Sequence, residues 1–221
     1  RDLWPAPLMN LAVAHPSCHA VVSCLLAAKC RVSPRDAKNG HCAVECLLTQ
    51  PHLSVDIFEV IFKHFLAEEH DGVIQPTKFS SHMLHVALER EAAFEFVVMI
   101  VSAKPYLVRR SNNMGELPIH TAAAHRADRQ LMKYLIDHAP ESIHAKTQSS
   151  LTPLQIAVVS RTSRGVVTVF HEADPSTVRE YDVRGWNVLC RAVWADAPSW
   201  IIEELHHCGA VYHRKDDKGD P

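Results

Sequence analysis

Glycine is scarce in this sequence. Only 7 of its 221 residues are Gly, whereas glycine makes up about 7% of an average protein. The seven stand singly, at positions 40, 72, 115, 165, 185, 209 and 219. A phosphate-binding loop needs several glycines close together, so the sequence excludes both the Walker loop and the G-x-G-x-x-G dinucleotide loop. Proline is more frequent, with 13 residues, and is therefore the main local breaker of structure.

The chain also lacks any strong excess of charge. Its net charge is −2, and 47% of its residues are hydrophobic, which is typical of a folded chain rather than a disordered one. A near-neutral charge offers no electrostatic attraction for nucleic acid or an anionic membrane. The stretch from Leu3 to Ala28 contains no Asp, Glu, Lys or Arg, but Pro5, Pro7 and Pro16 argue against a membrane helix there. We therefore expect no membrane insertion and no nucleic-acid partner.

The cysteines form no recognisable framework. There are seven, an odd number, and no C-x-x-C pair occurs. This pattern favours reduced thiols and an intracellular location, cytoplasmic or nuclear. His15 and His19 lie near Cys18 and Cys24, which leaves a metal-binding module at the N-terminus as one hypothesis. The spacing lacks the tight pairs of a structural zinc site, so we favour structural thiols, with no bound metal and no cofactor.

A fixed period of 35 residues runs along the chain. Pro105, Pro140 and Pro175 stand 35 residues apart, and several apolar columns fall in step with them. These columns are Leu84, Ile119, Leu154 and Leu189; Ala87, Ala122, Ala157 and Ala192; and the pairs Phe96–Val97, Leu131–Met132, Val166–Val167 and Ile201–Ile202. Because independent columns share one period, the sequence predicts a repeat protein.

Each unit is predicted to contain two short helices. The first spans about eight residues, as in Pro118–His125 and Pro153–Ser160, with Pro at the first helical position and Thr152 or Asn187 as N-cap. The second is longer, as in Arg129–His138. We expect a proline-containing loop next, then an extended stretch with a β-branched column and a polar turn. That column is Val108, Ile143 and Val178.

The prediction is an all-α fold, an α-solenoid of about six helix–turn–helix repeats with short β-hairpin-like finger loops. A single unit cannot bury its apolar face, whereas stacked units can. We place the whole of 1–221 in one solenoid, with helices at Leu8–Ala14 and Ala20–Ala28 in the first unit. The expected units are about 2–36, 37–76, 77–111, 112–146, 147–181 and 182–215, with the start of a further unit at 216–221.

Several segments resemble the ankyrin-repeat signature G-x-T-P-L-H-x-A. The matching segments are Gly115–Ala122, Leu151–Ala157 and Met83–Ala87, with Asp182–Gly185 resembling the family's hairpin tip and Cys208–Ala210 its helix-ending Gly-Ala. The period of 35 departs from the family's usual 33. Ser80 and Ser150 stand where the tip has Gly in other units, at Gly40, Gly115, Gly185 and Gly219. The resemblance implies a structural, hydrogen-bonding role for His85 and His120.

The resemblance also implies where a partner protein would bind. In such solenoids the finger loops and the first helices form the concave binding face. The candidates on that face are Met114, Glu116, Arg184 and Trp186, and aromatic and Arg side chains are enriched at binding hot spots. Packing of Trp186 against the next loop is an equally good interpretation. Arg109, Arg110, Arg126 and Arg129 form a modest basic cluster, either a solvated surface or a site for an acidic partner.

We expect a protein–protein interaction scaffold, not an enzyme. Neither the nucleophile elbow G-x-S-x-G nor H-E-x-x-H occurs, and no small-molecule substrate is expected. A second hypothesis is that the chain is the targeting or regulatory segment of a larger enzyme or channel, since it begins at Arg1 rather than Met. The N-terminal Cys/His module remains the third. The identity of the partner cannot be inferred from the sequence.

Overall fold

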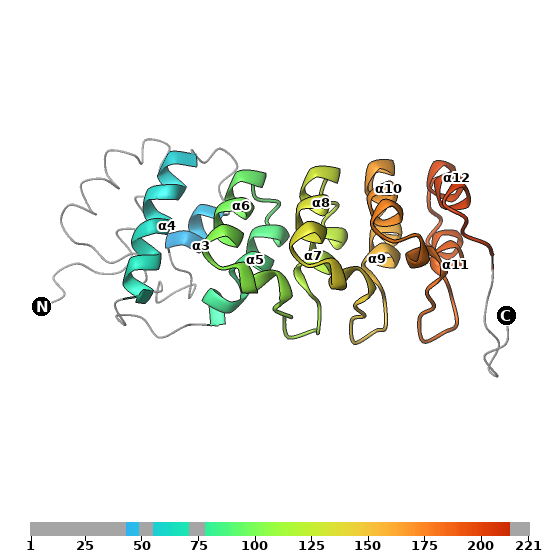
Figure 1. Cartoon of the computed structure of the whole chain (residues 1–221), viewed down its shortest axis with the longest axis horizontal. Helices are drawn as coiled ribbons and strands as arrows, with labels where there is room; N and C mark the ends of the chain where they lie inside the picture. Colours follow the sequence, from blue (N-terminus) through green and yellow to red (C-terminus); the bar gives the residue numbers. More distant parts are fainter. Residues whose placement is uncertain (1–42, 49–54, 71–77, 213–221) are drawn as a thin grey trace, which may run out of the picture. The chain divides into compact units, whose positions relative to one another are not determined.

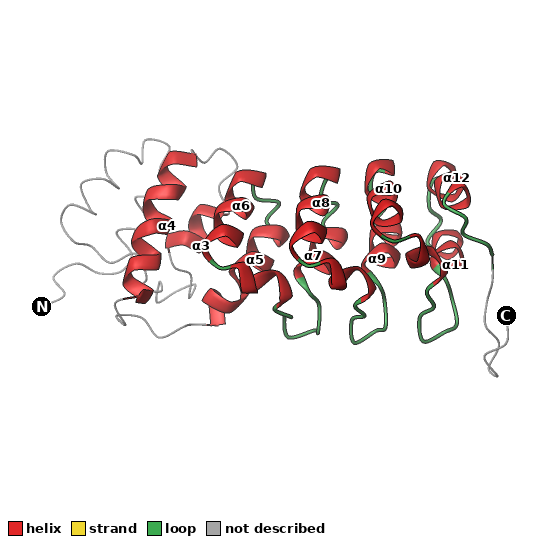
Figure 2. Ribbon diagram, viewed as in Figure 1, coloured by secondary structure: helices red, strands yellow, loops and turns green. Residues whose placement is uncertain are grey.

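The computed structural model describes residues 43–48, 55–70 and 78–212 (Figure 1). They belong to two compact units that divide between Ser102 and Ala103. The regular elements in these ranges are all helical, and no β-strand occurs among them (Figure 2). This confirms the predicted all-α class. The two helices expected in the first repeat, before residue 43, lie outside the described residues. So does the start of a further repeat expected at 216–221.

The described residues of the first unit form two helix pairs. The helices are α3 (Ala43–Leu48), α4 (Val55–His70), α5 (Lys78–Glu89) and α6 (Phe94–Ala103), the last of which reaches the boundary. Their core is aromatic: the Phe58 ring stacks on Phe62 with centroids 5.4 Å apart and on Phe96 at 4.4 Å. Such stacked rings contribute to stability beyond the apolar area that they bury.

The second unit repeats one order of elements three times: a 3-10 helix, a loop, a first helix and a second helix. The elements are η1 (Pro105–Arg109), α7 (Pro118–Ala124), α8 (Arg129–His138), η2 (Pro140–His144), α9 (Pro153–Val159), α10 (Arg164–Ala173), η3 (Pro175–Arg179), α11 (Val188–Trp194) and α12 (Ser199–His207). In Figure 1 the first helices α7, α9 and α11 form one row, and the second helices α8, α10 and α12 form another.

Small and branched apolar side chains fill the space between these helices. Ala122, Ala157 and Ala192 are buried on the first helices, so their neighbours can approach closely. Leu154, at the start of α9, is fully buried. Most of the apolar positions predicted on the second helices, among them Leu135 and Phe170, are also buried, whereas Leu131 and Ile202 are partly exposed.

The first helices begin as the sequence predicts. Pro118 and Pro153 occupy the first helical turn of α7 and α9. The Thr152 hydroxyl accepts a hydrogen bond from the Gln155 N–H at 3.3 Å, and the Asn187 side chain accepts one from the Cys190 N–H at 3.0 Å. Each cap satisfies an N–H group that the first turn of a helix leaves without a backbone partner.

The first helices end without glycine. Glu91, Arg126, Arg161 and Asp196, which are 35 residues apart, have φ of 52°, 56°, 56° and 50°. The N–H of the residue after each one donates to a carbonyl five residues earlier, as in the 2.9 Å bond from Ala127 to Ala122. This is a Schellman ending, in which glycine is the usual left-handed residue. Because four other residues take that conformation, the chain needs few glycines.

Two local expectations are wrong. Val108, Ile143 and Val178 lie in the 3-10 helices η1, η2 and η3, not in extended stretches. Each of these helices begins at a proline, whose fixed φ suits a helical turn. Ser80 was expected at a loop tip but lies within α5. α5 lacks both the proline that begins α7 and α9 and the Asn cap that begins α11, because Met83 and His82 stand in those places. It therefore lacks the local signals that set the start of the other first helices, and it extends further toward the N-terminus.

In the ranges that the structure describes, no helix combines the length and the apolar character needed to cross a membrane.

Candidate partner-binding surface

Three loops of the second unit, drawn in green in Figure 2, share one hydrogen-bonding pattern. They span residues 110–117, 145–152 and 180–187, and each joins a 3-10 helix to the next first helix. In the last loop the Asp182 N–H donates to the Trp186 carbonyl at 3.0 Å, and the Gly185 N–H donates to the Asp182 carbonyl at 3.1 Å. The same two bonds recur 35 and 70 residues earlier. We call these loops, together with α7, α9 and α11, the loop face.

A polar side chain closes each loop from within. The Asn112 side-chain oxygen accepts from the N–H groups of Met114 and Glu116 at 2.9 and 3.0 Å. Asp182 holds the equivalent bonds from Arg184 and Trp186 at 2.7 and 3.0 Å. Backbone groups that are satisfied in this way favour one conformation of the loop.

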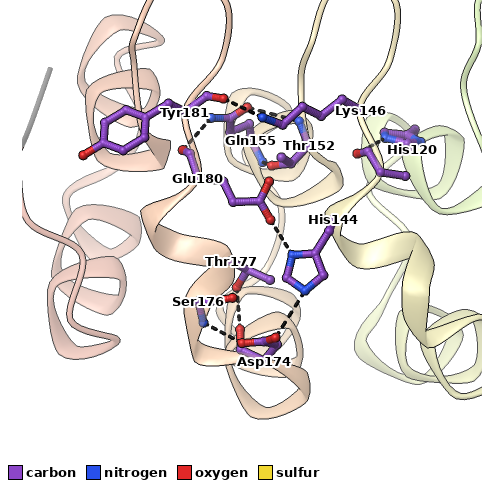
Figure 3. Close-up of polar contacts among 11 residues, drawn as sticks. His120, His144, Lys146, Thr152, Gln155, Asp174, Ser176, Thr177, Glu180 and Tyr181 are labelled. Carbon is purple, nitrogen blue, oxygen red and sulfur yellow. Dashed lines mark hydrogen bonds and ion pairs between the residues drawn. The ribbon is translucent and has the colours of Figure 1, made fainter. Parts of the chain in front are cut away.

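Buried polar residues of the first helices α7 and α9 form hydrogen bonds to the loop of the next repeat. His120 Nδ1 accepts from the Leu117 N–H at 3.0 Å, and its Nε2 lies 3.0 Å from the Ala145 carbonyl, to which it donates. Gln155 occupies the same position one repeat later and donates from Nε2 to the carbonyl of Glu180 at 3.2 Å (Figure 3). The same Nε2 also donates to the carbonyl of Trp186 at 3.1 Å. The loops are thus held by the helices beneath them. The structure agrees with the hydrogen-bonding role expected for His120, and it buries His85 as well.

A charged cluster also joins neighbouring repeats of the second unit (Figure 3). The His144 ring lies between two carboxylates: Nδ1 bonds to Glu180, and Nε2 is 3.2 Å from Asp174. The bond to Glu180 raises the pKa of His144 above its ordinary value of 6.5. The Asp174 pKa is lowered, chiefly by the hydrogen bond from the Ser176 N–H. Lys146 donates to the Tyr181 carbonyl at 2.9 Å.

Two of the predicted site residues line a pocket of about 230 Å³. Met114 is 64% exposed, and Glu116 is half-buried and accepts a hydrogen bond from the Asn112 amide at 2.9 Å. The rest of the lining comes from the next loop and from α9: Thr147, Gln148, Ser149, Leu151, Ile156, Val159 and Ser160. The lining therefore combines apolar side chains with several neutral polar groups and a single carboxylate, that of Glu116.

The other two predicted residues, Arg184 and Trp186, contact each other on the last loop. The Arg184 guanidinium lies 5.6 Å from the centre of the Trp186 ring. Arg191 lies 5.3 Å from the same ring and 5.8 Å from that of Trp194. The two indole rings are 6.1 Å apart. Cation–π contacts of this kind hold aromatic and Arg side chains in a fixed arrangement.

Sequence reasoning missed part of this arrangement. Trp194 is 60% exposed on α11, 35 residues after Val159 and eight after Trp186, yet it was not among the candidates. Aligning the outward positions of the first helices would have shown the size of the side chain increasing from Ala124 to Val159 to Trp194. The pairing of Arg191 with Asp182 is a second omission, because it depends on how the loop folds back onto α11.

The described residues contain no group of three or more His, Cys, Asp or Glu side chains arranged to hold a metal ion. The proposed N-terminal module at His15, Cys18, His19 and Cys24 lies outside those residues. Burial raises the pKa of the Cys208 thiol, which keeps it protonated and weakly nucleophilic.

Comparison of the chain with known protein families finds no matching family, and comparison with curated proteins finds no significant match.

Proposed function

We propose that this chain is a protein–protein interaction scaffold, an α-solenoid of ankyrin-like repeats that binds a partner protein through the loop face. The 35-residue period in sequence, helix pairs and loop hydrogen bonds supports the repeat architecture. Repeats that contact only their neighbours present long, regular surfaces for binding. In this proposal the three loops act as the finger loops.

The observation that carries the proposal is the exposure of large apolar side chains on loops and helices that are firmly held. Met114 is 64% exposed and Trp194 is 60% exposed. Both belong to the loop face, where internal hydrogen bonds fix the backbone. Exposed apolar groups on an ordered surface favour association with another protein, and little conformational entropy is lost when they bind.

The polar groups of the loop face support binding rather than catalysis. Asn112 and Asp182 accept hydrogen bonds within their own loops, and Gln155 donates to loop carbonyls. These side chains serve to hold the loops and are not directed at a reacting group. Recognition would depend on the shape and charge of the face.

The proposal is tested by chemical cross-linking and affinity capture with matched variants. A double variant, Met114→Ala with Trp194→Ala, removes the two exposed anchors, and Tyr106→Ala removes a side chain of similar exposure (56%) in η1, outside the loop face. We expect the wild type and Tyr106→Ala to capture the same protein and the double variant to lose it. Equal capture by all three would contradict the proposal, and circular dichroism checks that each variant is folded.

A further inference from the structure

The pocket on the loop face has the character of a receptor for one apolar side chain. Leu151, Ile156 and Val159 supply its apolar surface, and Met114 stands at its edge. A volume of about 230 Å³ is smaller than the cavities that take drug-sized ligands, which begin near 300 Å³. It suits a single Leu, Ile, Met or Phe side chain from a peptide lying across the face.

In the next repeat, the positions that correspond to the apolar lining hold large side chains in place of a pocket. Leu151, Ile156 and Val159 correspond, 35 residues later, to Trp186, Arg191 and Trp194. The Trp194 ring is exposed and tilted by 54° to the Trp186 ring. A peptide that enters the pocket and continues across the face would therefore contact the indole rings of Trp186 and Trp194.

Arg184 places a positive charge beside these aromatic rings. Its N–H donates to Asp182 at 2.7 Å, and its guanidinium lies over Trp186. Other arginines pair with carboxylates, as Arg129 does with Glu172 and Arg164 with Glu204. Arg184 has no carboxylate within ion-pair distance among the described residues, because Asp182, the nearest acid in its own loop, is paired with Arg191. A carboxylate supplied by a partner would complete the arrangement.

The distance between these two features sets the spacing of the partner's residues. Helices α9 and α11 are packed neighbours, and packed helices lie about 8–10 Å apart. An extended chain advances about 3.3 Å per residue. The pocket is lined by the loop at 110–117 as well as by α9, and Arg184 lies on the loop before α11. At least one such step, about three residues of an extended peptide, therefore separates the pocket from this cation.

We propose that the loop face binds an extended acidic peptide segment of the partner, with an apolar side chain in the pocket and an Asp or Glu at least about three residues away on Arg184. This inference rests on the proposed function and specifies the partner's chemistry. Glu116 fixes the register. Its carboxylate lies at the pocket and is oriented by Asn112, so it repels an acidic side chain there and directs the acid to Arg184.

The first experiment selects peptides without assuming a motif. The whole 221-residue chain is immobilised and exposed to a displayed library of random peptides, in parallel with the Met114→Ala, Trp194→Ala double variant. We expect the wild type to enrich peptides that share an apolar residue and an acid at the inferred spacing. Enrichment of basic or uncharged peptides that the double variant fails to bind would overturn the acidic-peptide inference and leave the proposed function standing. No difference between the two proteins would overturn both.

The second experiment measures affinity for a synthetic probe by fluorescence anisotropy. The probe is a fluorescein-labelled Gly/Ser peptide carrying one Leu and one Asp at the inferred spacing. We expect Arg184→Glu to weaken binding by about tenfold, because attraction becomes repulsion. A probe with Lys in place of Asp should restore binding to this variant. The matched control is Lys133→Glu, an equal change of charge on α8, where the side chain is 61% exposed; it should bind as the wild type does.

Two further outcomes would overturn the inference. One is equal affinity for probes in which Leu and Asp are adjacent or far apart, because the spacing would then carry no information. The other is a concentration-dependent dimer, seen by sedimentation, that Trp194→Ala abolishes, because a second copy of the chain would then cover the face. Glu116→Gln provides a further check: it should reduce the loss of affinity caused by replacing Leu with Asp in the probe, while the apolar lining still favours Leu.

Discussion

The carboxylate of Asp182 accepts a hydrogen bond from Nε of Arg191 at 2.6 Å, and the same oxygen forms an ion pair with Nη2. Both side chains are buried, with 0% of Asp182 and 10% of Arg191 exposed. The other carboxylate oxygen closes the loop by accepting two backbone N–H groups. One carboxylate thereby holds the loop that carries Arg184 and fastens it to α11.

Asp182→Ala should therefore destabilise the second unit strongly. It leaves the Arg191 charge buried without its partner, which costs about 3 kcal/mol, and it removes the acceptor for the loop. Asp182→Asn keeps an oxygen for the loop N–H groups and should cost less. Urea unfolding followed by circular dichroism measures both changes.

The control for this pair is Asp137→Ala. Asp137 forms an exposed i,i+4 pair with Lys133 at 3.4 Å, and such pairs contribute about 0.5 kcal/mol or less. If Asp182→Ala unfolds at the same urea concentration as Asp137→Ala, the buried pair does not hold the loop in the way described.

Leu154→Asp tests the stacked core. Leu154 is fully buried at the start of α9, and a carboxylate there would have to unfold its surroundings or be protonated. We expect a loss of about 4 kcal/mol or more and a thermal transition that is no longer cooperative. Val159→Asp places the same charge on the same helix at a site that is 37% exposed, and it should cost far less. Similar melting curves for the two variants would contradict the repeat assignment.

The sequence predicts the helices of the second unit well because their causes are local and periodic. The bounds predicted for the second helix of one unit, Arg129–His138, are those of α8. The caps at Thr152 and Asn187 also form as predicted, since an N-cap side chain bonds only three residues ahead. A column that recurs every 35 residues carries the same information several times.

The remaining features depend on contacts between distant residues. Arg191 finds Asp182 only after the loop has folded back, and His144 meets Glu180 across 36 residues. The start of α5 at Lys78 depends on two signals that are missing, a proline at Met83 and an N-cap side chain at His82, rather than on one that is present. The contact of Trp194 with Trp186 depends likewise on how the loop lies against α11.

The left-handed position in each loop can be tested by two opposite substitutions, one that replaces glycine and one that introduces it. Gly115 has φ of 73°, and a Cβ there would lie 3.1 Å from Cγ of Gln148. Gly115→Ala should cost about 1–2 kcal/mol from the left-handed conformation, plus the cost of the contact. Ser150 takes the equivalent position with φ of 56°, so Ser150→Gly should stabilise the chain by about 0.5 kcal/mol.

Gly209→Ala separates the cost of the left-handed conformation from the cost of a close contact. Its φ is 79°, but a Cβ there meets nothing within 4 Å, so Gly209→Ala should show only the conformational cost. The free energy of unfolding in urea measures all three variants. A larger loss for Gly209→Ala than for Gly115→Ala would show that the contact with Gln148 contributes nothing, and destabilisation by Ser150→Gly would refute the role of this position.

The His144 cluster predicts a specific dependence of stability on pH. Because the pKa of His144 is raised in the folded chain, its protonated form stabilises that chain. The contribution is fully present below the ordinary pKa of 6.5 and is lost as the pH rises through the raised value. His144 is 40% exposed, so solvent screening limits the effect to about 0.5 kcal/mol. Asp174 acts at the acid end: its lowered pKa gives stability that is lost as the pH falls through that value.

The measurement compares urea midpoints of the wild type and His144→Gln between about pH 6 and pH 9. We expect the wild type to be the more stable at the acid end of this range and the difference to disappear at the alkaline end. His206→Gln on α12, an exposed site, should follow the wild type throughout. Glutamine retains a donor but cannot carry the charge, so a constant difference between wild type and His144→Gln would mean that packing, not protonation, links His144 to Glu180.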